Sequence, residues 1–200
     1  MPALVYVVIG LPLGFLVGTF GEYWIHRAMH RGLFLTKRHW EHHRQDQGQG
    51  ALKEFRDYAF GTVGLAVLSF PVDYYFVSGG VLAVGILCGT LAHAMFAAWC
   101  HQAQHQDPRL VLWLSSTPVH FVHHKRGQSR HNFGISVDWW DRVFRTYKSE
   151  PDWVTILDPS APLGKWWQVD WLGRRGTLDT AMSFAQTNHQ TPVSDGVFPK

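Results

Sequence analysis

The sequence predicts an all-α fold, an integral membrane helical bundle with about three spans and a cytosolic helical cap. The first reason is the distribution of charge: the 18 Lys and Arg residues are absent from 1–26 and from 58–106, where Glu22 and Asp73 are the only acidic residues. The second reason is histidine, because 12 of the 13 histidines lie between positions 26 and 131. Charges confined in this way are typical of membrane proteins rather than of soluble globules.

The composition excludes three classes of protein. With 14% aromatic and only 16% charged residues, the chain is too apolar to be intrinsically disordered. Its two cysteines are too few for a disulfide framework or an iron–sulfur cluster. The net charge of +3 comes from basic residues that flank apolar segments and form no stripe with stacking aromatics, so no nucleic acid is expected as a partner.

Three apolar segments are each about 20 residues long, and a helix of that length measures about 30 Å, enough to cross a bilayer. They cover residues 3–20, 58–77 and 81–100. Ser78-Gly79-Gly80 supplies a turn between the last two, which predicts an antiparallel hairpin with both far ends on one side of the membrane. That side carries the Lys and Arg residues and is therefore expected to be cytoplasmic. One alternative stays open, a soluble protein with one buried helical core and polar caps.

The chain is expected to divide into two parts. Residues 1–157 form the membrane domain, and residues 158–200 form a C-terminal tail without a sustained hydrophobic period. Three tryptophans in this tail, Trp166, Trp167 and Trp171, favour a position at the protein surface or at the membrane interface.

Ten histidines repeat a two-part pattern on either side of the predicted hairpin. His26 and His30 form the motif H-x3-H, and His39, His42 and His43 form H-x2-H-H. After the hairpin the same two motifs return in the same order, formed by His101, His105, His120, His123 and His124. On a helix, side chains at i, i+3 and i+4 leave the same face or lie beside it, so each motif presents its imidazoles together.

Ten imidazoles on four helical segments match two metal ions, because one ion takes about three to six ligands. Neutral imidazole suits Fe, Zn, Cu and Ni, whereas Mg and Ca take oxygen ligands. Glu41, the one carboxylate inside a motif, is interpreted as an orienting or solvated group rather than a ligand. His93 lies about two turns deeper in the membrane than His101, and we assign it a structural or substrate-channel role.

Six segments of the chain resemble motifs of the membrane fatty acid hydroxylase/sterol desaturase superfamily, over roughly residues 20–148. They are IHRAMH (25–30), HWEHH (39–43), HQAQH (101–105), HFVHH (120–124), HNFG (131–134) and WWDRVFRTY (139–147). The chain departs from the family at Arg145, which stands where a glycine usually precedes Thr-Tyr.

The resemblance implies that residues 1–157 form a fatty acid hydroxylase-like membrane domain. It implies a histidine-bound centre of two iron ions, with O2 as co-substrate, that hydroxylates or desaturates a lipid such as a fatty acyl chain or a sterol. By position, the metal ligands would be His26, His30, His39, His42, His43, His101, His105, His120, His123 and His124. Zinc can replace iron in such a site in purified protein.

Residues close to the last motifs are candidates for supporting roles. Candidates to orient the imidazoles are Asn132, Asp138, Asp141 and His131. Candidates to line the entry of a substrate from the bilayer are Phe121, Phe133, Trp139 and Trp140.

The electrons for this reaction must come from another protein. The chain has no dinucleotide fingerprint, no cysteine set for an iron–sulfur cluster and no evident haem domain. A cytochrome b5-like or ferredoxin-like donor that docks on the basic cytoplasmic face is therefore expected. The oligomeric state is left open.

Two alternative functions stay open. A carotenoid hydroxylase has similar histidine motifs, so the resemblance does not decide the substrate. A membrane protein that binds haem or metal without oxygenase activity is the second alternative. The positions of the histidines argue against a transporter, because transport ligands lie near the bilayer midplane, whereas these lie outside the apolar segments.

Overall fold

The computed structural model describes residues 2–173, except for the side chains of residues 62, 63 and 65–67. All regular elements in this part of the chain are helical, which confirms the predicted all-α class. The helices are α1 (Ala3–His30), α2 (Thr36–Gln45), α3 (Ala51–Phe76), α4 (Val81–Gln106), α5 (Val119–Lys125) and α6 (Trp139–Val143), with short 3-10 helices η1 (Pro108–Val111), η2 (Trp153–Ile156) and η3 (Trp166–Gln168).

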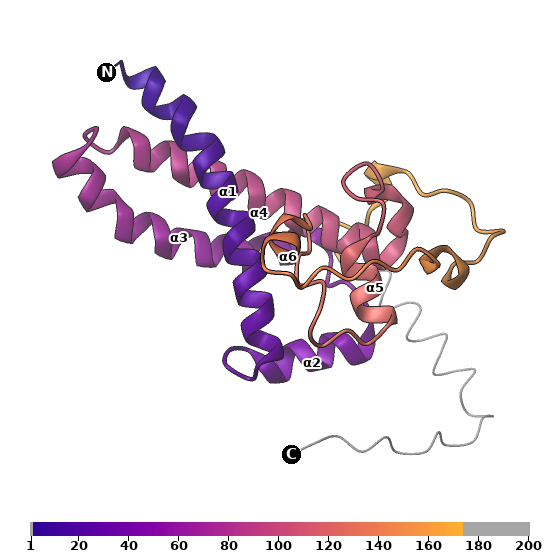
Figure 1. Ribbon diagram of the computed structural model, residues 1–200. Helices are drawn as coiled ribbons and strands as arrows, with labels where there is room; N and C mark the ends of the chain where they lie inside the picture. Colours follow the sequence, from indigo (N-terminus) through magenta and orange to yellow (C-terminus); the bar gives the residue numbers. More distant parts are fainter. Residues whose placement is uncertain (1, 174–200) are drawn as a thin grey trace.

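Three long helices, α1, α3 and α4, form one part of the fold. In Figure 1, α3 and α4 run side by side as a hairpin, and α1 crosses α4. By length and composition, α1 and α4 can each cross a bilayer, which is consistent with a membrane protein. Helix α3 covers the third predicted span, and its passage through the membrane stays a prediction.

The crossing of α1 and α4 depends on glycine. A Cβ atom added to Gly14 would lie 2.1 Å from the carbonyl oxygen of Ile86, and one added to Gly89 would lie 2.0 Å from that of Leu11. Small residues four apart on both helices therefore let the two backbones touch, as is common between membrane helices. The close crossing fixes the directions in which the two helices leave the membrane and hence the place where their histidine-bearing ends meet.

The turn between α3 and α4 forms where Ser78-Gly79-Gly80 predicted it, with Gly79 and Gly80 at φ +68° and +95°. The buried Asp73 holds this turn together, because its carboxylate accepts hydrogen bonds from the Ser78 hydroxyl and from the Ala83 amide. Asp73 thereby satisfies a free N–H group at the start of α4, and its negative charge stabilises the N-terminus of that helix.

The segment after η2 returns to the helices. The amides of Ala51 and Leu52 donate to the carbonyls of Asp170 and Trp171, and Val169 is buried in a small core with Cys100. Residues 158–173 of the expected tail thus pack against the start of α3 and the end of α4. The remaining residues of that tail, 174–200, lie outside the described part of the chain.

Candidate metal centre

Four helix ends carry the ten histidines of the repeated motifs. The C-terminal turns of α1 and α4 carry the H-x3-H pairs, and the short helices α2 and α5 carry the H-x2-H-H motifs. The side chain of Gln104 on α4 starts α5, because its Oε1 accepts hydrogen bonds from the His120 and Phe121 amides at 2.9 and 3.3 Å. The second pair and the second H-x2-H-H motif are thereby held at a fixed distance from each other.

One set of five histidines, cluster A, brings its ring nitrogens within 4.8 Å of one another. It consists of His26, His30, His39, His43 and His123. Four of the Nε2 atoms form a closed ring of contacts: His30 to His39 at 2.8 Å, His39 to His43 at 3.0 Å, His43 to His123 at 3.2 Å and His123 to His30 at 2.8 Å.

The second set, cluster B, lies beside the first. It consists of His42, His101, His105, His120 and His124. The ring nitrogens of the first four lie within 4.8 Å of one another. The ring of His124 lies 4.6 Å from the rings of His42 and His120 and 4.7 Å from that of His105. The two clusters meet where the rings of His43 and His124 stack at 4.0 Å.

The two H-x2-H-H motifs exchange their middle histidines. His39 and His43 of α2 join cluster A with the pair from α1, whereas the middle residue, His42, joins cluster B. In the same way His120 and His124 of α5 lie in cluster B, and His123 reaches cluster A. Each cluster therefore contains four histidines from one half of the chain and one from the other half.

Both clusters have the chemistry of a metal site. A ring nitrogen of imidazole donates one hydrogen bond or accepts one, so at most two of the four short Nε2 contacts in the closed ring can be hydrogen bonds. Two nitrogens bound to one ion, each about 2.1 Å from it, lie about 3.0–3.4 Å apart, close to the spacing in cluster A. In addition, buried nitrogens of His26, His105 and His120 have no hydrogen-bond partner in the described structure. Two ions, one in each cluster, would give a partner to one nitrogen of each of these rings.

The second nitrogens of several imidazoles are held by neighbouring acceptors. In cluster A, Nδ1 of His26 bonds to the carbonyl of Phe133 at 2.6 Å, and Nδ1 of His123 bonds to the carbonyl of His131 at 2.8 Å. A proton on Nδ1 leaves the lone pair of Nε2 free for a metal ion.

Cluster B is held partly by carboxylates. Nδ1 of His101 lies 2.5 Å from Oε2 of the buried Glu54. Nδ1 of His105 and Nδ1 of His124 lie 3.5 and 3.4 Å from Oδ1 of Asp46, which Lys125 also contacts. Nδ1 of His42 bonds to the carbonyl of Gln47 at 3.1 Å.

The imidazoles of α2 and α5 are neutral at pH 7. Burial, followed by repulsion from neighbouring imidazoles, lowers the pKa of His43 to about 3 and that of His124 to about 4. The same two causes lower the pKa of His39, His42 and His120. Since a metal ion binds only the unprotonated nitrogen, these rings present their lone pairs at physiological pH.

Three of the residues predicted to orient imidazoles make other contacts in the structure. Asn132 bonds to Gln128 and to the backbone of Lys148, and Asp138 bonds to Ser115 and Arg142. Asp141 accepts from the amides of Phe133 and Gly134 and from the hydroxyl of Thr146. Asp141 thus acts on cluster A only indirectly, through the loop whose Phe133 carbonyl holds His26. His131 is exposed, and its carbonyl rather than its ring contacts a candidate ligand.

The four aromatics predicted to line a substrate entry are spread over three environments. Phe133 is buried against the rings of His26, His30 and His123. Phe121 is buried against Trp153 in a small apolar cluster. Trp140 contacts Phe20 and donates to the hydroxyl of Thr19, and Trp139 is half-exposed. Only Phe133 of the four touches the histidine clusters in the described contacts.

Glu41 and His93 do not contact the clusters. Glu41 pairs with Arg44 and Gln45 on the outer face of α2. His93 is buried 3.2 Å from Oε2 of Glu22, whose Oε1 accepts from the amides of Ile135 and Ser136. This pair joins α1, α4 and the loop before α6, which agrees with the structural role among the two assigned to His93.

Sequence reasoning missed Asp46, Glu54 and Gln104. Each is a single residue at no regular sequence spacing from the histidine that it contacts, so no periodic pattern identifies it. A usable signal exists for Glu54, because it accepts from the amide of Gln49 just before α3 at 2.8 Å, and an acidic residue in a first helical turn is recognisable.

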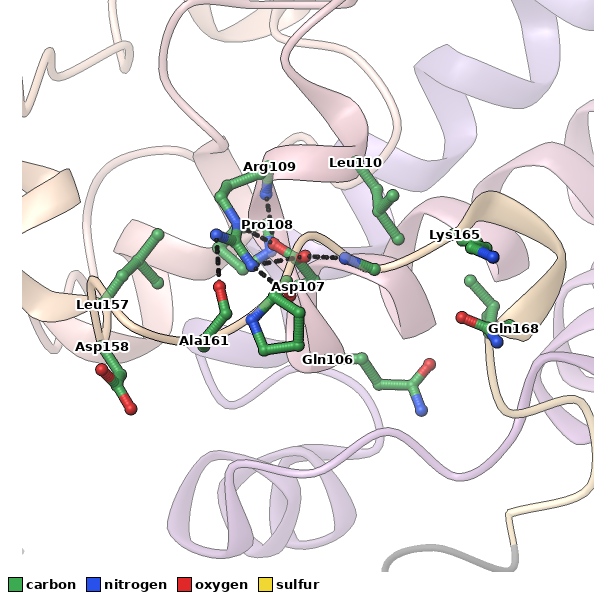
Figure 2. Close-up of a pocket in the computed structure, with 13 residues that line it drawn as sticks. Gln106, Asp107, Pro108, Arg109, Leu110, Leu157, Asp158, Ala161, Lys165 and Gln168 are labelled. Atoms are coloured by element: carbon green, nitrogen blue, oxygen red, sulfur yellow. Dashed lines mark hydrogen bonds and ion pairs between the residues drawn. The ribbon is translucent and has the colours of Figure 1, made fainter.

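One described cavity lies away from the histidine clusters, beside the C-terminal segment. It measures about 300 Å³ and is bounded by η1 and the segment that leads to η3. Figure 2 shows Arg109 at its centre, bonded to Asp107 and to the Ala161 carbonyl. None of the ten histidines lines this cavity, and the guanidinium of Arg109 is already paired with Asp107. The cavity is therefore part of the packing of the C-terminal segment.

The chain matches a model of a known protein family. A family model described as Fatty acid hydroxylase matches residues 11–146, from the first third of α1 to just beyond α6. The matched region contains all ten histidines of the two clusters. Searches of curated proteins and of solved structures give no match.

Proposed function

The chain belongs to the fatty acid hydroxylase family, and from this premise we propose that it is a membrane-bound non-haem di-iron oxygenase. It hydroxylates, or desaturates, an aliphatic C–H bond of a lipid such as a fatty acyl chain or a sterol. The observation that carries the proposal is the pair of five-imidazole clusters at the ends of two apolar helices. Sets of donors made mainly of imidazole, with Asp46 beside His105 and His124 as the carboxylate, are suited to iron and unsuited to magnesium or calcium.

Bound iron would supply the activation of O2 that an unactivated C–H bond requires, since acid–base groups cannot attack such a bond. The protein's residues do the rest. His26, His30, His39, His43 and His123 would hold one ion, and His42, His101, His105, His120 and His124 the other. Buried rings and helix ends exclude water around both positions, which limits side reactions.

The proposed reaction needs electrons from outside the chain. Hydroxylation consumes one O2, two electrons and two protons, and gives the alcohol and one water. A cytochrome b5-like or ferredoxin-like protein is the proposed donor. The lipid enters from the bilayer, and Phe133, beside cluster A, is the proposed aromatic contact. The metal centre is proposed to lie on the cytoplasmic side.

The geometry disfavours the haem-binding alternative. Haem iron between two axial imidazoles needs them on opposite faces of a wide macrocycle. Four of the Nε2 atoms of cluster A lie 2.8–3.2 Å from their neighbours, and Nε2 of His101 lies 3.1 Å from that of His42. Such short separations leave no room for a porphyrin.

Lipid profiling tests the function. Cells that express the protein are compared with cells that express His123→Ala, which removes one ring of cluster A. A lipid heavier by one oxygen, or lighter by two hydrogens, only in the first sample would establish hydroxylation or desaturation, and its identity would separate acyl, sterol and carotenoid substrates. Unchanged lipid profiles together with full metal loading would contradict the oxygenase proposal.

Topology needs a separate experiment. In a variant without the exposed Cys88, single cysteines at Ser78 and Ser149 are labelled with an impermeant thiol reagent in sealed vesicles. The proposal requires labelling from opposite sides. Labelling of both from one side would contradict the hairpin.

A further inference from the structure

The two clusters differ in the groups that hold their imidazoles. The described hydrogen bonds to the rings of cluster A come from backbone carbonyls, those of Phe133 and His131. In cluster B, three of the five rings face carboxylates: His101 faces Glu54, and His105 and His124 face Asp46. Near cluster A, Glu22 and Asp141 bond to backbone amides and not to its rings, and Asp46 acts on His43 only through its charge, without a described hydrogen bond.

This difference changes the donor strength of the rings. A carboxylate that accepts the Nδ1 proton pushes electron density toward Nε2 and makes it a stronger ligand than a neutral carbonyl does. It also supplies negative charge next to an ion with a charge of two. Because neutral imidazoles leave that charge uncompensated in a buried site, an adjacent anion lowers the cost of binding.

We propose that the two metal positions are unequal and fill in order, cluster B first and cluster A second, with Asp46 and Glu54 as the positioning residues that set this order. The inference rests on the two-metal centre of the proposed function and deepens it. Cluster A, held only by carbonyls, is then the weaker position and the one whose ion exchanges.

The two hydrogen bonds of Glu54 define what the substitution Glu54→Gln would do to His101. Its Oε1 accepts from the amide of Gln49 at 2.8 Å while Oε2 faces His101 at 2.5 Å. In Glu54→Gln the amide oxygen must stay on the Gln49 side, so the NH2 group turns to His101. That ring must then accept at Nδ1 and carry its proton on Nε2, where it blocks the metal.

The experiment is a titration of the full-length apoprotein in detergent with Co(II), followed by visible absorption and by equilibrium dialysis. The wild type is expected to bind two ions in two phases. His120→Ala, which removes a ring from cluster B, should abolish the tight phase, and His26→Ala, which removes one from cluster A, should abolish the weak phase.

Glu54→Gln should weaken the tight phase about 10- to 100-fold, the usual cost of losing a group that orients a ligand, and leave the weak phase unchanged. Asp46→Asn is the second variant. Asp46 has φ +50°, a conformation that Asn adopts readily, so its backbone is preserved. The matched control is Glu41→Gln, a carboxylate on α2 that pairs with Arg44 outside the clusters and should change neither phase.

The outcomes separate this inference from the proposed function. Equal weakening of both phases by Glu54→Gln would indicate a general structural role and overturn the proposal, as would loss of the tight phase in His26→Ala. Two equivalent ions in the wild type would overturn it too, while leaving the two-metal centre intact. A wild type that binds fewer than two ions would contradict the proposed function itself.

Discussion

The helix crossing in the membrane and the histidine cap achieve close packing in opposite ways. Where α1 crosses α4, backbone lies against backbone because glycines leave out the side chains. In the cap, ten imidazoles fill the space between four helix ends. An added methyl group at the crossing is therefore expected to destabilise the packing, and a removed imidazole in the cap is expected to weaken metal binding. The same molecule thus contains one region sensitive to added volume and one sensitive to loss of ligand nitrogens.

The largest effects are expected in the cap, from two neighbouring residues. His42→Ala should remove the ion of cluster B, and His43→Ala that of cluster A, because the two rings serve different clusters. Each variant should retain about one of two metal equivalents, measured by elemental analysis after dialysis. Loss of the same ion in both variants would show that the middle histidines are not exchanged.

The crossing should respond next. Gly14→Ala places a methyl group 2.1 Å from the Ile86 carbonyl oxygen and should cost about 1–3 kcal/mol of stability, or more, as overpacking does. Thermal unfolding in detergent, followed by circular dichroism, measures this.

The same helix offers the control for that change. Gly21 has no heavy atom within 4 Å of its added Cβ, so Gly21→Ala should be neutral or stabilising by up to about 1 kcal/mol. Equal destabilisation by both alanines would mean that the crossing is looser than the structure shows.

A smaller effect is expected between the two regions, at Asp141. Its carboxylate accepts from Phe133, Gly134 and Thr146, and an amide nitrogen in Asp141→Asn would oppose one of these donors. We expect a loss of about 1–3 kcal/mol, in chemical unfolding, together with weaker metal binding in cluster A. Asp158→Asn, on an exposed carboxylate that contacts Ser160, should change neither quantity.

The smallest effect is expected at Arg145, which has φ +56°. A left-handed conformation costs a non-glycine residue about 1–2 kcal/mol. Glycine removes this strain but loses more backbone entropy on folding, which offsets part of the stabilisation. Arg145→Gly should therefore raise the stability by up to about 1 kcal/mol, seen as a higher melting temperature. Arg130→Gly removes the same charge at a residue without positive φ and should not stabilise.

The sequence predicted the features that depend on local pattern. The apolar runs became long helices, Ser78-Gly79-Gly80 became their turn, and the spacing of ten histidines indicated that they share a site. The departure at Arg145 also has a structural meaning, since the usual glycine there suits a left-handed residue.

Features that depend on tertiary placement were not predictable. Helical spacing put His42 and His43 on one face or beside it, and only the packing of α2 against α4 and α5 decides that they serve different clusters. Asp46 and Glu54 are single carboxylates whose partners lie 59 or more and 47 positions away, so no local motif connects them. Asp141 looked like a direct partner of a ring and instead holds a loop.

The exchange of middle histidines has a consequence for biosynthesis. When the ribosome has completed α4, the nascent chain carries seven of the ten histidines, and both sets are still incomplete. Cluster A awaits His123, and cluster B awaits His120 and His124. Both sets are completed within five residues of α5, so neither ion can be fully enclosed during early translation, and both positions become complete late and together, before either can bind its ion fully.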